Sequence, residues 1–534
     1  MHQLLPSNII AFMLLFSICF FQPSNAAMPI HVNGSRFIQP ADSINDPATN
    51  KVFFIKGIDY QPGGSSGYNS KSNSDALSNV DICLRDTFAF QQLGINTIRV
   101  YALNPDLNHD ECMSVLNKAG IYLILDVNGP NYGENLNRAD PSNTYNAAYL
   151  TRIFKFIEAF KNYPNVLGFF SGNEVINDES NYASVDPAYI RAIQRDMKQY
   201  IAKHSNRSIP VGYSAADNTN LRLATYAYLQ CNSIDGKLLN RVLQESSSDF
   251  FGLNSYQWCS GGGSASWQSS GYAILNSSFS SLLHSPILFS EYGCNSNPPR
   301  TFTEVSQGVY NGLINTFSGG LVYEYSEENN NYGMVKINPN DNSIMYKQDF
   351  INLKNQFAKV SLPVIYESSI NNKNDNVIKC DASLIKSKYD EFGVNDFVIV
   401  DQPSNIASLI KNGVKPSNVG TIKKDYIPAS TFSYDVIDVT GNTLTPTITY
   451  HTENQSDYPS SSFVTNTSSL SKIINSQKLI TSFATSNGNA TSVSHIIVSS
   501  FSSMKTLKNK DRAIKLTTDF GLFGLLAGVF LAFL

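Results

Sequence analysis

The stretch VLGFFSGNE at Val166–Glu174 is a short apolar run that ends in polar residues. A second stretch of the same form, PILFSEYG at Pro286–Gly293, presents Glu291 directly after its apolar run. Runs of this kind are typical of buried parallel strands whose carboxyl ends open into a site. We therefore expect two strands that deliver Glu174 and Glu291 to the same end of a sheet.

Apolar runs alternate with longer amphipathic stretches from about residue 27 to residue 356. Helical spacing of the apolar residues is clearest in Asn146–Lys161 and Pro187–His204. Eight strands that alternate with helices over roughly 300 residues predict an α/β fold, the (β/α)8 TIM barrel. The predicted strands are Val52–Ile58, Thr97–Tyr101, Ile121–Val127, Val166–Ser171, Ile209–Tyr213, Phe250–Asn254, Ile287–Ser290 and Gly320–Tyr325.

Two glutamates at strand ends suit the cleavage of a glycosidic bond. In a (β/α)8 barrel the carboxyl ends of the strands share one cleft, and glycoside cleavage needs a proton donor and a nucleophile or base. We assign the proton donor (acid/base) role to Glu174 and the nucleophile role to Glu291. A double-displacement reaction then requires carboxyl groups about 5–5.5 Å apart. The alternative is that both are ordinary strand-end carboxylates.

Polar residues beside the two glutamates are candidates for the same site. Asn173 is placed to hold a sugar 2-hydroxyl, and its alternative role is an Asx turn. Tyr256 and Tyr292 are candidates to hydrogen-bond the carboxylates, and alternatively they are packing residues whose hydroxyls contact water. The seven histidines are scattered without ligand spacing, so we expect no metal and no cofactor.

Composition limits the classes of partner. The chain has 534 residues, of which 42% are hydrophobic, and a formal net charge of -4. This length is enough for one large domain and an accessory region. The weak charge argues against nucleic acid or an anionic membrane surface as a partner. Aromatic residues make up 12% of the chain, which is enough to stack against sugar rings, although most phenylalanines are expected to fill the core.

Both ends of the chain carry export signals. The apolar run Ile9–Phe21 is too short to span a bilayer comfortably and is followed by small residues, which indicates a secretory signal peptide. Small residues at Ser499, Ser500, Ser502 and Ser503, the polar spacer Lys505–Arg512 and the apolar tail Phe520–Leu534 form the pattern of a GPI-attachment signal. The alternative is a tail-anchored or single-pass helix. We expect a secreted protein that a GPI lipid holds at the outer face of the plasma membrane or in the cell wall.

The chain is predicted to have five parts. A signal peptide (1–26) precedes the (β/α)8 catalytic domain (27–356), and a small β-rich accessory annex follows (357–442). Residues 443–503 are rich in Ser, Thr and Asn, which predicts a disordered, glycosylated stalk without a core, the alternative being another small domain. Residues 504–534 form the GPI-attachment propeptide.

Sequons and cysteines agree with secretion. The six Asn-x-Ser/Thr sequons are candidate N-glycosylation sites. They lie at Asn33, Asn206, Asn276, Asn454, Asn466 and Asn489. After Cys19 leaves with the signal peptide, six cysteines remain, which is an even number for an oxidising compartment. Six cysteines allow fifteen pairings, and the spacing alone does not choose among them.

Five collinear segments carry a resemblance to a known family. They are KGIDYQPGG at Lys56–Gly64, NTIRVY at Asn96–Tyr101, GNE at Gly172–Glu174, SEYG at Ser290–Gly293 and GLVYEY at Gly320–Tyr325. Together they resemble the fungal GPI-anchored 1,3-β-glucanosyltransferases of glycoside hydrolase family 72, over about residues 52 to 380. The resemblance implies a retaining enzyme that cleaves a β-1,3-glucan internally. It then transfers the new reducing end to the non-reducing end of another β-1,3-glucan, which elongates cell-wall glucan.

The resemblance also implies roles for individual residues. Glu174 would be the acid/base and Glu291 the nucleophile, and Arg99 looks like the strand-end arginine that pairs with the nucleophile and keeps it ionised. Asp126 has the alternative role of a structural hydrogen-bond acceptor. The implied substrate-binding positions are Gln61, Tyr101, Asp126, Asn173, Tyr256 and Tyr323.

The same resemblance implies a cysteine pairing, and the chain differs from many family members in two features. The implied disulfides are Cys83–Cys112, Cys231–Cys380 and Cys259–Cys294, and the second would join the annex to the barrel. Gln257 stands where many family members have glutamate, which bears on acceptor preference and rate. Because Cys380 is the only cysteine after Cys294, the chain resembles the branch that lacks a Cys-rich carbohydrate-binding module.

Three functions remain distinct possibilities at this stage. The first is a glucan transglycosylase, the second a β-1,3-glucan hydrolase, and the third a non-catalytic protein that binds wall glucan. Transfer requires aromatic platforms that hold an acceptor glucan and exclude water. The candidates for such platforms, each alternatively a core residue, are Tyr323, Tyr325, Trp258 and Trp267. We expect a monomer whose partners are glucan chains and, through the lipid anchor, the membrane.

Overall fold

The computed structural model describes residues 27–41, 45–177, 182–234, 237–238, 245–261, 265–370, 379–381, 383, 385, 392–394, 396–423 and 426–450. The predicted signal peptide, the GPI propeptide and most of the predicted stalk lie outside these residues. So do the sequons at Asn454, Asn466 and Asn489. Within the described ranges, no helix has the length and the apolar character needed to cross a membrane.

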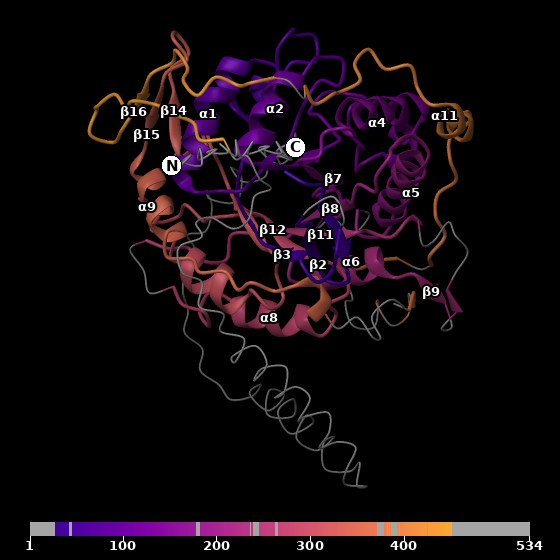
Figure 1. Cartoon of the computed structure of the whole chain (residues 1–534). Coiled ribbons are helices and arrows are strands. Elements are labelled where there is room, and N and C mark those ends of the chain that lie inside the picture. The colour runs from indigo at the N-terminus through magenta and orange to yellow at the C-terminus, as the bar shows by residue number, and fades with distance from the viewer. Residues whose placement is uncertain are drawn as a thin grey trace, which may run out of the picture.

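Eight parallel strands form a closed barrel (Figure 1). Each predicted strand has its counterpart in the barrel, so the prediction of a (β/α)8 fold is confirmed. The ring closes where the last strand pairs with the first, Val322 lying opposite Ile58. In chain order the strands are β4 (Ile55–Asp59), β5 (Thr97–Val100), β6 (Tyr122–Asp126), β7 (Val166–Asn173), β8 (Val211–Ala216), β11 (Phe250–Ser255), β12 (Ile287–Tyr292) and β13 (Gly319–Val322).

The first predicted strand, Val52–Ile58, is divided between two sheets. Its beginning belongs to β3 (Lys51–Phe53), which pairs antiparallel with β2 (Arg36–Gln39), and β2 pairs in turn with β1 (His31–Asn33). Phe37 and Phe53 join the apolar cluster inside the barrel, where Phe37 packs edge-on against Phe250 at a centroid distance of 5.6 Å. The N-terminal sheet therefore closes the amino-terminal end of the barrel.

Helices surround the barrel, and one main helix follows each strand. The two predicted helices correspond to α4 (Ala147–Phe160) and α5 (Asp186–His204), with no bound more than one residue from its predicted position. The main helices are α1 (Val80–Leu93), α2 (Asp110–Ala119), α4 (Ala147–Phe160), α5 (Asp186–His204), α6 (Arg222–Gln230), α8 (Tyr272–Ser280), the π-helix η2 (Val305–Gly312) and α9 (Gln348–Phe357). Shorter elements are η1 (Ser65–Gly67), α3 (Pro141–Thr144), β9 (Ser233–Ile234), β10 (Lys237–Leu238) and η3 (Glu367–Ser369).

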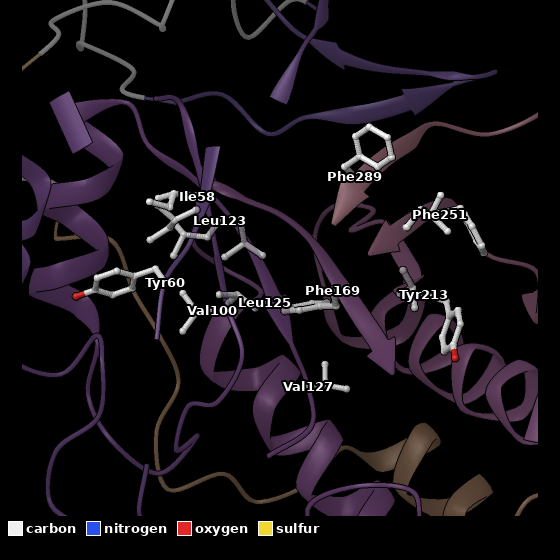
Figure 2. Close-up of a cluster of buried hydrophobic side chains, with 14 of the residues drawn as sticks. Ile58, Tyr60, Val100, Leu123, Leu125, Val127, Phe169, Tyr213, Phe251 and Phe289 are labelled. Atoms are coloured by element: carbon white, nitrogen blue, oxygen red, sulfur yellow. The ribbon is translucent and has the colours of Figure 1, made fainter. Parts of the chain in front are cut away.

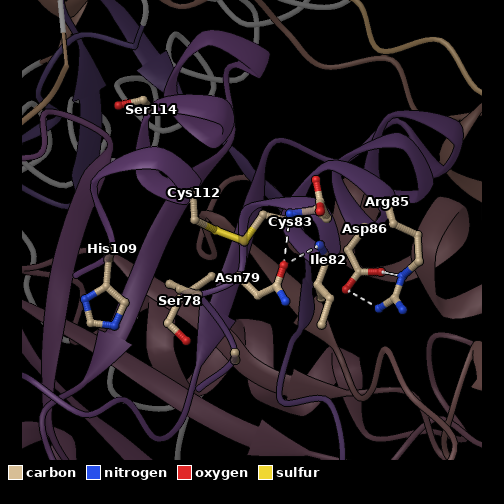
Figure 3. The surroundings of a disulfide bond; sticks show 12 residues. Ser78, Asn79, Ile82, Cys83, Arg85, Asp86, His109, Cys112 and Ser114 are labelled. Carbon is tan, nitrogen blue, oxygen red and sulfur yellow. Dashed lines mark hydrogen bonds and ion pairs between the residues drawn. A yellow bond between two sulfur atoms is a disulfide. The ribbon is translucent and has the colours of Figure 1, made fainter. Parts of the chain in front are cut away.

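Local sequence sets the ends of α1 and its attachment to α2. The Asn79 side chain accepts hydrogen bonds from the backbone N–H groups of Asp81 and Ile82, which satisfies donors that the helix itself leaves free. Gly94, with φ of 70°, ends the helix in the left-handed conformation that glycine adopts without strain. A disulfide between Cys83 and Cys112 joins α1 to α2 (Figure 3).

The other two disulfides lie at opposite ends of the barrel. Cys259–Cys294 joins the loops that follow β11 and β12. Cys231–Cys380 joins the end of α6 to the segment that follows the last barrel helix. The structure thus forms the three pairs that the family resemblance implied.

Strand alternation builds two apolar layers. Leu123, Leu125 and Phe169 face outward into the core between barrel and helices (Figure 2), whereas Ile124 and Phe170 face inward. The inward cluster fills the barrel from its amino-terminal end up to the level of Phe170. Beyond this level the inward side chains are polar, so the carboxyl-terminal end of the barrel is where a site is built.

The region predicted as a β-rich annex contributes little sheet. In its described part, β16 (Val436–Ile437) extends a hairpin of β14 (Val335–Ile337) and β15 (Ile344–Tyr346). A helix, α11 (Ile406–Asn412), lies beside α4 and α5, and the connecting chain runs across the helices (Figure 1). These contacts continue to Thr449 and Tyr450, so packed chain extends past residue 443, where the stalk was expected to begin.

Candidate active site

The polar residues above the apolar plug come from the ends of five strands. Arg99, Asp126, Asn173, Asn254 and Glu291 lie at or next to the carboxyl ends of β5, β6, β7, β11 and β12. Their side chains form one hydrogen-bonded cluster inside the barrel. The strands deliver polar side chains here because each one leaves the apolar interior at the same end of the barrel.

Glu291 is held by donors on both of its carboxylate oxygens. Its Oε1 accepts hydrogen bonds from Arg99 Nη1 at 3.1 Å and from the Tyr101 hydroxyl at 2.9 Å. Its Oε2 accepts from the Tyr256 hydroxyl at 2.7 Å. A register irregularity in β12 between Phe289 and Tyr292 lets both Ser290 and Glu291 face the barrel interior. Three donors fix the carboxylate in one orientation, as a nucleophile requires.

Arg99 is fully buried and is the cation that pairs with the Glu291 carboxylate. Its Nε and Nη2 donate to the two oxygens of Asp126 at 3.0 and 2.8 Å, and Nη2 also donates to Asn173 Oδ1 at 3.0 Å. Burial lowers the pKa of Arg99, but the Asp126 and Glu291 charges outweigh it and hold the pKa well above the usual value. Both carboxylate oxygens of Asp126 accept hydrogen bonds from Arg99, which agrees with the alternative role of Asp126 as a structural hydrogen-bond acceptor.

Glu174 follows β7 and takes a strained backbone conformation. Its φ is 49°, in the left-handed region that costs a non-glycine residue about 1 kcal/mol or more. The Asn254 side chain donates to Glu174 Oε1 at 2.8 Å. Burial, and then the negative charge of Glu291, raise the pKa of Glu174 to about 7. A carboxyl group with this pKa carries a proton at mildly acidic pH, as a general acid must.

Asn254 links the two glutamates and was missed as a functional residue from sequence. Its Nδ2 donates both to Glu174 and, at 3.1 Å, to Asn173 Oδ1. Its Oδ1 accepts from the Ser214 and Ser290 hydroxyls at 3.1 and 2.7 Å. The available signal was its place at the end of a predicted strand, the same signal that selected Glu174 and Glu291.

Aromatic side chains surround the Glu291 carboxylate. The Tyr323 ring meets those of Tyr101 and Tyr256 edge to face, at centroid distances of 6.5 and 6.3 Å. Gln61 lies nearby at the end of β4, where its side-chain oxygen accepts from the Ala102 backbone N–H at 3.0 Å. The sequence-predicted positions Gln61, Tyr101, Asn173, Tyr256 and Tyr323 are thus all brought to this end of the barrel.

Tyr292 is a correction to the sequence prediction. The predicted role was contact with the carboxylates or the substrate, but its side chain is fully buried outside the barrel wall and packs against Phe289. The irregularity in β12 turns both Ser290 and Glu291 inward, and the residue after them, Tyr292, then faces outward. Tyr325 and Trp258 are likewise buried core residues, Tyr325 donating to Asp86 at 2.6 Å.

The Gln257 side chain is hydrogen-bonded to Asp217. Its amide donates to Asp217 Oδ2, which also accepts from the Ser255 hydroxyl at 2.6 Å. The other oxygen of Asp217 pairs with Arg222. A glutamate at position 257 would put a second carboxylate against Asp217, so glutamine fits the partner that this chain provides.

No group of three or more His, Cys, Asp or Glu side chains suited to a metal ion occurs among the described residues.

The sequons that fall within the described ranges differ in exposure. Asn206 is exposed. Asn276 is half-buried and accepts from the Thr316 hydroxyl at 2.6 Å. Asn33 lies at the end of β1 and donates to Glu367 at 2.7 Å.

A barrel whose carboxyl end presents one glutamate of raised pKa and a second glutamate held by three hydrogen-bond donors has the site of a glycoside-cleaving enzyme. The profile of the Glucanosyltransferase family, glycoside hydrolase family 72, matches residues 20–361, and the chain belongs to this family. The sequence prediction of the family is thereby confirmed.

Named relatives and solved structures agree with this assignment. The chain is 60% identical over 430 residues to the probable 1,3-beta-glucanosyltransferase GAS3 of Saccharomyces cerevisiae, covering 80% of this chain and 81% of the relative. It is 45% identical to the 1,3-beta-glucanosyltransferase gel2 of Aspergillus fumigatus over 399 residues, 75% of this chain and 78% of the relative. A point mutant of Saccharomyces cerevisiae Gas2p, solved in complex with laminaritetraose and laminaripentaose, shares 37% identity with a TM-score of 0.56. That match covers 67% of this chain and 72% of the Gas2p chain.

Proposed function

We propose that the chain is a retaining 1,3-β-glucanosyltransferase that cleaves a β-1,3-glucan internally and joins the new reducing end to the non-reducing end of another. One observation carries this proposal. Hydrogen bonds run without a break from Glu174 through Asn254, Asn173 and Arg99 to Glu291, so one network orients both carboxyl groups. The family match supports the substrate class.

The first half-reaction uses the two glutamates in opposite protonation states. The Glu291 carboxylate attacks the anomeric carbon, and the bond between this carbon and the glycosidic oxygen breaks. Glu174 gives its proton to the departing oxygen, which leaves as the hydroxyl of the released chain. Arg99, Tyr101 and Tyr256 hold Glu291 in place for the attack.

The second half-reaction decides between transfer and hydrolysis. Glu174, now a carboxylate, removes the proton from an acceptor hydroxyl, whose oxygen attacks the anomeric carbon and releases Glu291. A glucan acceptor yields a longer glucan, whereas water yields hydrolysis. The rings of Tyr101, Tyr256 and Tyr323 supply apolar surface on which a sugar can displace water from this position.

We extend the proposal to the location of the enzyme, its glycosylation, its oligomeric state and its partners. A signal peptide at residues 1–26 and a GPI signal at 504–534 would place the enzyme outside the cell, at the plasma membrane or wall, where β-1,3-glucan is available. The exposed Asn206 is the strongest N-glycosylation candidate among the described sequons. The protein is expected to act as a monomer without metal or cofactor, with β-1,3-glucan donor and acceptor chains as its partners.

Product sizing tests the reaction. Purified protein is incubated with a reduced laminari-oligosaccharide, and the products are separated by size. A transferase yields products longer than the substrate, a hydrolase yields only shorter ones, and a wall-binding protein leaves the substrate intact. The variants Glu174→Gln and Glu291→Gln should each lose transfer and hydrolysis while retaining the fold. Substantial transfer by either variant refutes the assigned roles.

A further inference from the structure

Besides Glu174, Glu291 and Asp126, a fourth carboxyl group lies in the barrel beside the catalytic network and takes no part in the reaction described above. Asp59 ends β4, where Ile55 faces the barrel interior and Ile58 faces outward, so strand alternation places Asp59 on the inner side. Its Cα lies opposite that of Arg99 in the neighbouring strand. Asp59 is 0% exposed, and neither of its carboxyl oxygens has a hydrogen-bond partner.

The charges around Asp59 argue for an uncharged carboxyl group. Arg99 is already hydrogen-bonded to Asp126 and Glu291, which balance or exceed its single positive charge. A further buried carboxylate without any donor would be strongly unfavourable. The groups that interact electrostatically with Asp59 are Arg99 and Tyr101 on and after β5, Asp126 on β6, Tyr256 after β11, Glu291 on β12, and Tyr323 and Glu324 after β13.

The geometry points to Asp59 as a positioning residue that acts through Arg99 and Glu291. As an uncharged acid, Asp59 fills the space beside the Arg99 guanidinium and does not compete with Asp126 and Glu291 for its positive charge. Arg99 therefore stays shared between Asp126 and the nucleophile. Burial, the main cause, raises the pKa of Asp59 well above its usual value, although the Arg99 charge opposes the shift. Once ionised at higher pH, Asp59 draws Arg99 away and repels Glu291, which lowers activity.

The test compares neutral variants across pH. Because this role belongs to the proposed transferase reaction, kcat/KM is measured on a reduced laminari-oligosaccharide from pH 4 to pH 9. Asp59→Asn has nearly the shape of the uncharged acid, and it should keep kcat/KM within about threefold of the wild type at pH 5. Its activity should decline less steeply above neutral pH, because the ionisation of Asp59 no longer adds to that of Glu174. Glu304→Gln is the matched control: it neutralises another fully buried carboxyl group outside the catalytic network and should leave the pH profile unchanged.

A second measurement does not depend on the reaction. A carboxyl group whose pKa is raised by folding makes the folded state lose stability as pH rises from the unfolded pKa toward the folded one. The urea midpoint of Asp59→Asn, relative to wild type, should therefore increase between pH 4 and pH 8. A wild type inactive on glucan refutes the proposed function and leaves this comparison intact.

Three outcomes would overturn the role of Asp59. One is a loss of activity greater than about 100-fold at pH 5 in a folded Asp59→Asn protein, which means that a charge is needed. The second is a decline above neutral pH that matches the wild type in both position and slope. The third is a failure to fold by both Asp59→Asn and the smaller Asp59→Ser, because replacing an uncharged acid with an uncharged amide should preserve the barrel.

Discussion

Asn254→Ala should move the alkaline limit of activity to higher pH. The Asn254 amide donates to Glu174 Oε1 at 2.8 Å and so favours the ionised form of this acid. A hydrogen bond to a charged group contributes about 1.5–3 kcal/mol. At about 1.4 kcal/mol per pKa unit, its loss raises the pKa of Glu174 from about 7 to about 8–9. Because Glu174 must be protonated for the first step, activity then persists to higher pH.

The same substitution should lower the maximal rate. Asn254 also holds Asn173 and accepts from two serine hydroxyls, so its removal loosens the groups that aim Glu174 at the glycosidic oxygen. A misplaced catalytic group reduces kcat by about 10- to 100-fold. A variant with a lower kcat and activity that persists to higher pH therefore supports this role of Asn254, because damage to the fold would lower the rate without extending the pH range.

The assay is the pH dependence of kcat/KM, which reports the acid of the free enzyme. Ser290→Ala is the matched control, since it removes the hydroxyl that donates to Asn254 Oδ1 at 2.7 Å and leaves the bond to Glu174 in place. Its alkaline limit should stay near that of the wild type. An unchanged limit in a folded Asn254→Ala protein would refute both the proton donor assignment and the electrostatic reasoning behind it.

Three further changes have expected outcomes. Burial raises the pKa of Glu304 from 4.5 to about 7, so the wild type loses stability as pH rises through this window. Glu304→Gln should match the wild type at pH 4 and exceed it by about 3 kcal/mol at pH 8 in urea unfolding, whereas equal midpoints at pH 8 would contradict this. Arg99→Met removes the cation that pairs with Asp126 and Glu291, so the free energy of unfolding should fall by about 3–5 kcal/mol and transfer should be nearly lost. A variant as stable as the wild type in urea would refute this. Replacing both Cys231 and Cys380 by serine should lower stability by about 2–5 kcal/mol but leave kcat unchanged, since this bridge lies away from the glutamates. A large fall in kcat for the folded double variant would count against that separation.

Much of the fold was predictable because its signals are local. Each barrel strand is an apolar run bounded by polar residues, and a closed parallel barrel buries such runs on both faces. The division of Val52–Ile58 between β3 and β4 was not predictable, because both halves are apolar and only the position of the N-terminal sheet separates them. The annex was predicted as β-rich from apolar triplets such as 398–400, yet that segment is not a strand in the structure.

The site was predictable only in part. Glu174 and Glu291 stand out because each follows an apolar strand. Asn254 also ends an apolar strand, but an asparagine is not recognisable from its residue type as the link between two catalytic carboxyl groups. Tyr292 was misassigned because a polar residue at a strand end faces inward or outward according to local register, and the irregularity in β12 decides this.

The sequence by itself determined the alternation of strands and helices, the two glutamates at strand ends and, through its collinear motifs, the family. Only the tertiary structure decided that the pKa values of Glu174 and Asp59 are raised. These pKa shifts depend on burial and on the charges contributed by other strands, as the position of Asp59 beside Arg99 shows. Groups more than a hundred residues apart determine them together, because closure of the barrel brings their strand ends into one buried, weakly hydrated space.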